Sequence, residues 1–197
     1  MQNHRAKNQG VTMRIVAGKF KGRTLHTPTG LNTRPTSQRT REALFNVLQH
    51  GIEDFTLEGA RVLDLFAGSG ALGIEALSRG AGYCIFVDDA LPARAALREN
   101  IDTLGLGGQT RIFRRDATRL NPAGNLGAFD IVFADPPYDK SMGEAALRST
   151  LKGGWLKPDG IFVLEERKTA EIDLPEGVEV LDQRVHGEAQ VVILRAV

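Results

Sequence analysis

Two short segments of this 197-residue sequence hold residues whose types and spacing could do chemistry. The first is Asp135-Pro136-Pro137-Tyr138, which follows the apolar run at 129–134. The two prolines fix the backbone and remove two N–H donors, so this loop presents carbonyl oxygens and one carboxylate. Tyr138 adds an aromatic face on which a nucleic-acid base could stack. The segment therefore predicts a pocket of hydrogen-bond acceptors beside a stacking platform.

Such a pocket suits an exocyclic amino group of a base. The nitrogen of that group is a poor nucleophile, because its lone pair is delocalised into the ring. The Asp135 carboxylate and the Pro136 carbonyl could accept the two N–H hydrogens and turn the lone pair toward a methyl donor. A rigid turn without a catalytic role is the alternative for a Pro-Pro pair on its own.

The second segment is a glycine-rich turn between an apolar strand and a helix, within Val62-Leu-Asp-Leu-Phe-Ala-Gly-Ser-Gly-Ala-Leu-Gly73. Its glycines leave room for a ligand to approach the backbone, and the helix that follows offers N–H groups in its first turn. The spacing also fits the Gly-x-Gly-x-x-Gly pattern of dinucleotide sites, so the turn alone does not choose a cofactor. The candidate cofactor-binding residues of this segment are Asp64, Phe66, Ala67, Gly68, Ser69 and Gly70.

Acidic residues lie at the ends of four predicted strands: Asp64, Asp88 with its neighbour Asp89, Asp116 and Asp135. Parallel strands bring their carboxyl ends to one edge of a sheet, so these acids are expected to line one crevice. They would attract the sulfonium and ammonium groups of S-adenosylmethionine, whereas they would repel the pyrophosphate of NAD. Each acid by itself could instead cap a helix or face solvent.

The apolar pattern predicts the elements that would position both segments. Strands are expected at 61–65, 83–88, 110–114, 129–134 and 161–165, and helices at 71–79, 91–104 and 141–152. Alternating strands and helices predict an α/β fold in which a mostly parallel sheet is covered on both faces. Residues 178–185 and 189–194 are expected to form an antiparallel hairpin that closes this sheet.

The N-terminal quarter follows a different pattern. Residues 14–27 predict a small basic β-hairpin with a turn at Lys21-Gly22. A helix is expected to follow, with Thr36 as its N-cap and a buried stripe at Leu44, Val47 and Leu48. The chain is thereby divided into a flexible extension at 1–12, a basic flank at 13–35 and a catalytic domain at 36–197.

The net charge of +1 hides an uneven distribution. Residues 1–50 hold nine Lys or Arg against the single acid Glu42, a net of +8, which leaves −7 for the other 147 residues. A basic segment beside an acidic body indicates a surface for a polyanion such as a nucleic acid. A solvated basic tail without a partner is the alternative.

Composition sets further limits. No apolar stretch approaches the roughly 20 residues of a membrane span, and the first residues lack the pattern of a secretory signal. A cytoplasmic location is therefore expected, and the protein is separately predicted to be a monomer. The lone Cys84 lies in an apolar run and has no second cysteine with which to frame a metal site, so it is interpreted as a core residue and no metal is predicted.

The segment Asp64-Leu-Phe-Ala-Gly-Ser-Gly70 resembles the first motif of class I S-adenosylmethionine-dependent methyltransferases, and Asp-Pro-Pro-Tyr resembles the motif of amino-methyltransferases, which is Asn or Asp, Pro-Pro, then Tyr or Phe. From Met13 onward the chain resembles the RsmD family more closely, in the segments at 13–23, 34–46, 64–79 and 135–138. That family methylates guanine N2 in the small-subunit (16S) ribosomal RNA of bacteria, at guanine 966. Gln38 stands where an acid is common in the family.

The resemblance implies a role for each matching position. A seven-stranded, Rossmann-like methyltransferase sheet is implied, with Asp64 and the glycine-rich turn facing the methionine part of the cofactor. Asp88, with Asp89 beside it, would hold the ribose, and Asp116 with Ala117 would meet the adenine. The 16S RNA, or an assembly intermediate of the small subunit, would be the partner. Its candidate contacts are Arg14, Lys19, Lys21, Arg23, Arg34, Arg39 and Arg41, although Arg39 and Arg41 could equally pair with acids.

Three alternatives stay open. A DNA adenine-N6 methyltransferase would use the same acceptor loop but usually needs a larger target-recognition region. An NAD-dependent oxidoreductase would share the glycine-rich turn, but its reaction would give Asp-Pro-Pro-Tyr no catalytic or binding role. A non-catalytic RNA-binding module would explain the basic flank alone. The choice of guanine comes from the resemblance, because the loop chemistry suits adenine and cytosine amino groups equally well.

Overall fold

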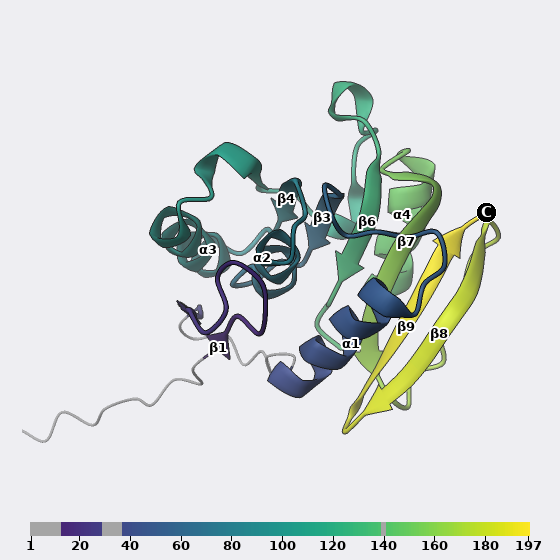
Figure 1. Cartoon of the computed structure of the whole chain (residues 1–197). Coiled ribbons are helices and arrows are strands. Elements are labelled where there is room, and N and C mark those ends of the chain that lie inside the picture. Colours follow the sequence, from purple (N-terminus) through teal and green to yellow (C-terminus); the bar gives the residue numbers. More distant parts are fainter. Residues whose placement is uncertain (1–12, 29–36, 139–140) are drawn as a thin grey trace, which may run out of the picture.

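The computed structural model describes residues 13–28, 37–138 and 141–197. Within them, seven strands form one sheet in the order β5-β4-β3-β6-β7-β9-β8 (Figure 1). The neighbours from β5 to β7 pair in parallel, while β7 with β9 and β9 with β8 pair antiparallel. This is the mostly parallel sheet with an antiparallel C-terminal hairpin that the sequence predicts, and it has the seven strands that the resemblance implies.

The strands fall close to the predicted ranges. Their bounds are β3 (Arg61–Leu65), β4 (Tyr83–Val87), β5 (Thr110–Phe113), β6 (Phe129–Ala134), β7 (Leu156–Arg167), β8 (Val178–His186) and β9 (Ala189–Ala196). The β7 strand begins five residues earlier than expected. Its first part contains Asp159 and Gly160, which are typical of a turn, and its pairing with β6 shifts register between Phe129 and Ile131.

Helices cover both faces of the sheet. On one face lie α1 (Gln38–His50), α2 (Ala71–Ser78) and α3 (Leu91–Leu104), and their buried side chains share a core with Val62, Phe133 and Val163. On the other face α4 (Met142–Lys152) packs with Leu63 and Phe162, and the short 3₁₀ turns at 117–119 and 124–126 contribute Ala117 and Leu126 to the same core. A third 3₁₀ turn, at 107–109, has no buried residue. Because successive strand residues alternate between the two cores, the apolar β3 and β6 are buried on both faces.

The start of α1 differs by one residue from the prediction. Its N-cap is Ser37, whose hydroxyl accepts a hydrogen bond from the Thr40 backbone N–H at 3.1 Å. The predicted cap, Thr36, lies outside the described residues, and the prediction that it caps the helix is wrong. Both Ser and Thr can cap a helix, with Ser the more favourable of the two, so the sequence Thr36-Ser37 contains two candidates. The predicted buried stripe at Leu44, Val47 and Leu48 is confirmed.

The N-terminal hairpin consists of β1 (Met13–Arg14) and β2 (Thr24–Leu25), paired antiparallel. It packs against α2 through buried polar contacts. The Glu75 carboxylate accepts hydrogen bonds from the backbone N–H groups of Val16 at 2.7 Å and Ala17 at 3.0 Å. The hairpin residues Met13, Ile15 and Leu25 belong to the same core as the sheet, so the basic flank is fixed to the body along its apolar side.

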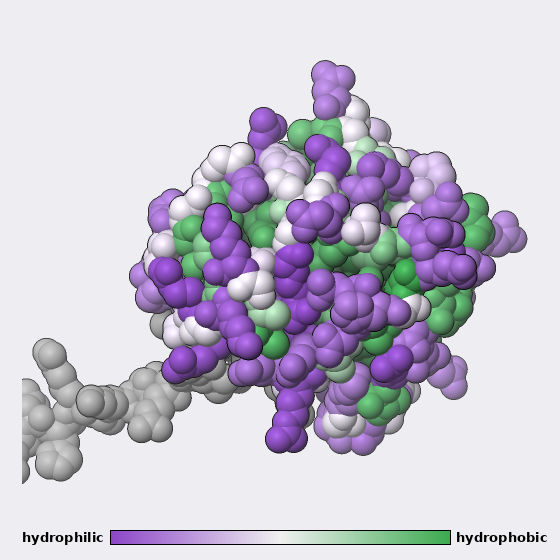
Figure 2. Space-filling model, in the orientation of Figure 1, coloured by the Kyte–Doolittle hydropathy of each residue, from purple (hydrophilic) through white to green (hydrophobic). Residues whose placement is uncertain are grey.

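The molecular surface on the side of α1 and the hairpin is mostly hydrophilic, and its hydrophobic residues form small separated patches (Figure 2). In the part of the chain that the structure describes, no helix is both long enough and apolar enough to cross a membrane.

Candidate active site

The two chemistry-bearing segments leave adjacent strands at the same edge of the sheet. Leu65, the last residue of β3, pairs with Ala134, the last residue of β6. Phe66 and Asp135 are the next residues along each strand, so the glycine-rich turn (residues 66–70) and the acceptor loop (residues 135–138) begin side by side. The chain order reverses between β3 and β6, and such a switch point is where open α/β sheets bind their ligands.

The glycine-rich turn has a strained backbone. Phe66, Gly68 and Gly70 all have positive φ angles, of 57°, 56° and 82°. Left-handed backbone geometry costs a residue with a side chain, here Phe66, about 1 kcal/mol or more. Such strained residues are found most often at functional sites. A Cβ on Gly68 would meet no atom closer than the Phe66 carbonyl oxygen at 3.9 Å, so the backbone there is open to a ligand.

The side chains of Asp64 and Asp88 accept hydrogen bonds from backbone N–H groups in and next to this turn. Asp64 is buried, and its Oδ2 accepts a hydrogen bond from the Gly73 N–H at 2.9 Å in the first turn of α2. Burial is the largest cause that raises the pKa of Asp64 to about 8, and the Gly73 hydrogen bond opposes it. Asp88 accepts from Gly68 N–H at 2.8 Å and from Ala90 N–H at 2.8 Å, and burial also raises its pKa.

The other two acids predicted to bind the cofactor, Asp89 and Asp116, are more exposed than Asp64 and Asp88. Asp89 is exposed, and Asp116 is exposed at the end of β5, where its carboxylate accepts from the backbone N–H and the hydroxyl of Thr118. Those hydrogen bonds lower the pKa of Asp116. Asp116 therefore caps its own short turn, and Ala117 beside it is buried.

The acceptor loop is partly sheltered. Pro136 is buried, Pro137 is exposed, and Asp135 and Tyr138 are half-buried. The Tyr138 hydroxyl donates a hydrogen bond to Glu165 Oε1 at 3.0 Å, and the Arg167 guanidinium lies 5.7 Å from the centre of the Tyr138 ring. Burial, followed by the charges of Glu165 and Asp135, raises the pKa of Tyr138 well above its usual value, so its hydroxyl stays protonated.

Sequence reasoning missed Glu165 and Glu166, although both are buried at this edge. They lie near the carboxyl end of β7, the parallel neighbour of β6. The rule that singled out Asp64, Asp88, Asp116 and Asp135 also applies there, because residue 165 ends the predicted strand at 161–165. That rule would have found Glu165 from the sequence.

Most of the described basic candidates for RNA contacts are exposed: Arg14, Lys19, Lys21, Arg23 and Arg39. Arg34 lies outside the described residues. Arg41 is a correction, because only 2% of its surface is exposed, and it therefore cannot meet a phosphate at the surface. Its Nη2 donates to the Arg14 carbonyl at 2.6 Å, and its charge interacts with Glu75 and Glu165. The alternative that Arg41 pairs with acids is the one the structure supports.

Comparison with known proteins agrees with this geometry. A family model described as Conserved hypothetical protein 95, the RsmD family, matches residues 13–195. The chain belongs to the RsmD family.

Individual relatives cover most of this chain. YlbH of Bacillus subtilis is 40% identical over 168 residues, which are 84% of this chain and 88% of that protein. Ribosomal RNA small subunit methyltransferase D of Haemophilus influenzae is 32% identical over 95% of each chain. The solved structure of yhhF from Escherichia coli has a TM-score of 0.80, is 30% identical and covers 94% of this chain and 98% of its own.

The strand-end edge of this RsmD-family protein suits S-adenosylmethionine better than a dinucleotide. Two N–H groups that could bind a pyrophosphate, those of Gly68 and Gly73, already donate to the Asp88 and Asp64 carboxylates. The phosphates of a dinucleotide would also be repelled by the charge of Asp88, whereas a sulfonium and an ammonium would be attracted to it. The open backbone at Gly68 gives such a ligand room to approach.

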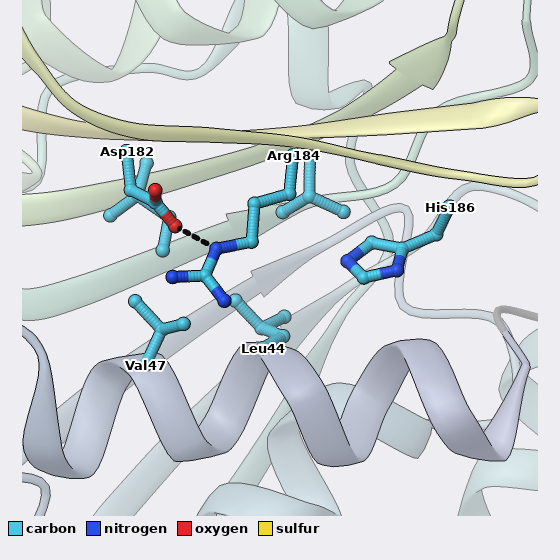
Figure 3. Close-up of a pocket in the computed structure, with 7 residues that line it drawn as sticks. Leu44, Val47, Asp182, Arg184 and His186 are labelled. Atoms are coloured by element: carbon cyan, nitrogen blue, oxygen red, sulfur yellow. Dashed lines mark hydrogen bonds and ion pairs between the residues drawn. The ribbon is translucent and has the colours of Figure 1, made fainter.

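A shallow pocket lies elsewhere in this RsmD-family protein, between α1 and the β8–β9 hairpin (Figure 3). The side chain of Arg184 extends from β8 over Leu44 and Val47 of α1, and its Nε donates to Asp182 Oδ2 at 2.7 Å. None of its lining residues comes from the glycine-rich turn or the acceptor loop. This pocket is therefore separate from the candidate active site.

Proposed function

We propose that this protein transfers the methyl group of S-adenosylmethionine to the N2 amino group of a guanine in small-subunit ribosomal RNA, with guanine 966 as the target. The observation that carries the proposal is the pairing of Leu65 with Ala134. It sets a cofactor turn and an amine-accepting loop next to each other at the switch point of the sheet. Relatives whose names describe small-subunit ribosomal RNA methyltransferases support the choice of RNA.

The acceptor loop prepares the nucleophile. The Asp135 carboxylate and the Pro136 carbonyl accept the two hydrogens of the amino group, which favours a pyramidal nitrogen with a directed lone pair. Tyr138 stacks on the base and fixes its plane, a contact suited to a base that has left its helix. When bound, S-adenosylmethionine supplies an electrophilic methyl group on a sulfonium. Transfer would form a nitrogen–carbon bond, break the carbon–sulfur bond to leave a neutral thioether, and release one proton from the methylated nitrogen to solvent, so the loop would keep its charge.

The cofactor is held by the turn and by the acids around it. Phe66, Ala67, Gly68, Ser69 and Gly70, backed by Asp64, face the methionine part. Asp88 and Asp89 bind the ribose hydroxyls, and Asp116 with Ala117 binds the adenine. Of these acids Asp89 and Asp116 are exposed and Asp88 is half-buried, so these three are accessible to a ligand.

The RNA is held by the exposed basic residues of the hairpin and of the first turn of α1. Arg14, Lys19, Lys21, Arg23 and Arg39 contact phosphates, and Arg34 joins them. Such contacts position the RNA without reading its sequence. We place the reaction in the cytoplasm, with the protein acting as a monomer on the small subunit or on its assembly intermediate.

Transfer of a labelled methyl group tests this proposal. The purified protein is incubated with small-subunit particles and with naked 16S RNA that lack the modification, in the presence of S-adenosylmethionine with a deuterated methyl group. Mass spectrometry of the digested RNA then identifies the modified nucleotide. The proposal expects labelled N2-methylguanosine at one position, and label in N6-methyladenosine or on no nucleotide would contradict it.

A further inference from the structure

The hydroxyl of Tyr138 is anchored in the protein. It donates to Glu165 Oε1 at 3.0 Å, and Glu165 is buried, with 6% of its surface exposed. A hydrogen bond to an ionised acceptor is stronger than one between neutral groups, particularly where water is excluded. The bond ties the acceptor loop after β6 to the adjacent strand β7, and so fixes the direction of the Tyr138 ring.

A buried cation stabilises the charge on Glu165. Arg41 of α1 interacts electrostatically with Glu165 and with Glu75, the carboxylate that holds the hairpin backbone. Its Nη2 also donates to the backbone carbonyl of Arg14 in β1. A carboxylate taken out of water needs such a partner, because an unpaired buried charge is strongly destabilising. A series of contacts thus runs from the hairpin through Arg41 and Glu165 to the hydroxyl of Tyr138.

We propose that Glu165 is a positioning residue of the reaction, which fixes the Tyr138 ring in the plane that the target base must adopt. The inference rests on the proposed function and adds to it a residue that touches neither base nor cofactor. Arg167 covers the Tyr138 ring at 5.7 Å, so the base stacks on the opposite face. A ring held before the base arrives loses less rotational freedom on binding, and this lowers the barrier to transfer.

Kinetics of three variants test the coupling between the two side chains. Tyr138→Phe keeps the ring and removes the hydroxyl, Glu165→Met keeps the length and removes the acceptor, and Glu165→Gln keeps an acceptor oxygen. The first two are expected to lower kcat by about 10-fold each, with the affinity for S-adenosylmethionine unchanged. The double variant is expected to be no slower than either single variant, and Glu165→Gln is expected to recover most of the loss.

A spectroscopic signature reports the same contact without any substrate. The chain has only two tyrosines, Tyr83 and Tyr138, so Tyr83→Phe leaves one tyrosine to titrate by its ultraviolet absorbance. In that background Tyr138 is expected to lose its proton only at a pH well above the ordinary range of tyrosine, because burial and the nearby carboxylates raise its pKa. Glu165→Gln is expected to bring its titration back toward the ordinary range of tyrosine, because one neighbouring negative charge is lost. Glu179→Gln, at an exposed position of β8, is the matched control and is expected to change neither kcat nor the titration.

The outcomes separate this inference from the proposed function. If the wild type transfers no methyl group to RNA while Glu165→Gln still shifts the titration, the proposed function fails and the contact stands. If the wild type is active, then independent losses that multiply in the double variant overturn the inference, as does a kcat for Tyr138→Phe equal to that of the wild type. Circular dichroism of each variant checks that it has folded, and Glu165→Gln keeps the test available should Glu165→Met not fold.

Discussion

At the scale of single residues, the proposed reaction depends on hydrogen-bond acceptors in the loop at 135–138. Asp135 works as an acceptor of hydrogen bonds rather than as a base, so an amide oxygen in its place should serve. We expect Asp135→Ala to lower kcat by about 100-fold or more, since removal of one pre-positioned hydrogen-bonding group typically costs that much. Asp135→Asn should retain much more activity. Single-turnover methyl transfer measures both, and equal losses in the two variants would contradict the acceptor role.

Asp64 makes the stability of the protein depend on pH. Its folded pKa of about 8 lies above the usual value of 3.8, so the folded state holds a proton that the unfolded state has lost between these pH values. The stabilising contribution is complete below about pH 4 and is lost as the pH rises toward 8. We expect the free energy of unfolding of Asp64→Asn, relative to wild type, to rise with pH by at most about 1.4 kcal/mol per unit across this window.

Urea unfolding at several pH values between 4 and 9 measures this difference. Above about pH 8 the two curves should run parallel, because Asp64 is then ionised in both states of the wild type. A difference that does not change with pH would show that Asp64 is charged throughout. The Asn side chain keeps an oxygen that can accept from the Gly73 N–H, so the comparison isolates the charge.

At the scale of elements, the packing of α2 on the sheet determines where the glycine-rich turn sits. Gly73 faces β4 so closely that an added Cβ would overlap the Phe86 ring and lie 2.7 Å from Cys84 Sγ. Gly→Ala inside a helix usually stabilises it, but here we expect a loss of roughly 1–3 kcal/mol from overpacking, with weaker cofactor binding. Gly107→Ala, where an added Cβ has nothing within 4 Å, is the control. Thermal unfolding with and without S-adenosylmethionine checks both.

The elements themselves could be predicted well from the sequence, because their signals are local. The helix at 91–104 was expected with the bounds that it has, and β3 and β6 likewise. The start of β7 could not be predicted, because Asp159 adopts a positive φ of 59° within a strand and its local sequence is that of a turn. Residues 157–160 have no partner in β6 and lie between the pairs Phe129–Leu156 and Ile131–Ile161, so the turn-like segment is accommodated as an irregularity within the strand.

The candidate site was predictable only in part. The strand-end rule identified both motif segments, because it needs no more than the order of the strands. The prediction that Arg41 contacts RNA is wrong, because its acidic neighbours Glu75 and Glu165 come from α2 and β7. The sequence around Arg41 does not indicate these neighbours. Whether a basic residue is buried depends on distant partners, and those appear only once the fold is known.

At the scale of the whole molecule, hydrogen bonds and a shared core connect the basic hairpin to the acidic strand edge. Asn100 of α3 links them: its Nδ2 donates to the Ser69 carbonyl at 2.9 Å and its Oδ1 accepts from the His26 N–H at 2.7 Å. The charges that attract RNA are therefore held at a fixed position relative to the cofactor turn. The basic hairpin can attract RNA over a long range, while the cofactor turn and the acceptor loop carry out the reaction.

This arrangement predicts how salt affects RNA binding. The double variant Lys19→Gln, Lys21→Gln should bind RNA more weakly. The slope of log affinity against log salt concentration should become less steep by about 1 to 2, because fewer counterions are released from the RNA when two phosphate contacts are missing. Lys152→Gln, on α4 at the opposite face of the sheet, should leave that slope unchanged. Fluorescence anisotropy with a 16S RNA fragment at several salt concentrations provides the comparison. An unchanged slope in the double variant would exclude this part of the hairpin from the interface.

The claim that the glycine-rich turn and the acceptor loop form one site is tested most directly by a crystal structure with S-adenosylhomocysteine. We predict that the ligand lies over Gly68, with its adenosine toward Asp88 and Asp116 and its sulfur facing Asp135 and Pro136. A ligand bound elsewhere, or with its sulfur directed away from the acceptor loop, would contradict the account.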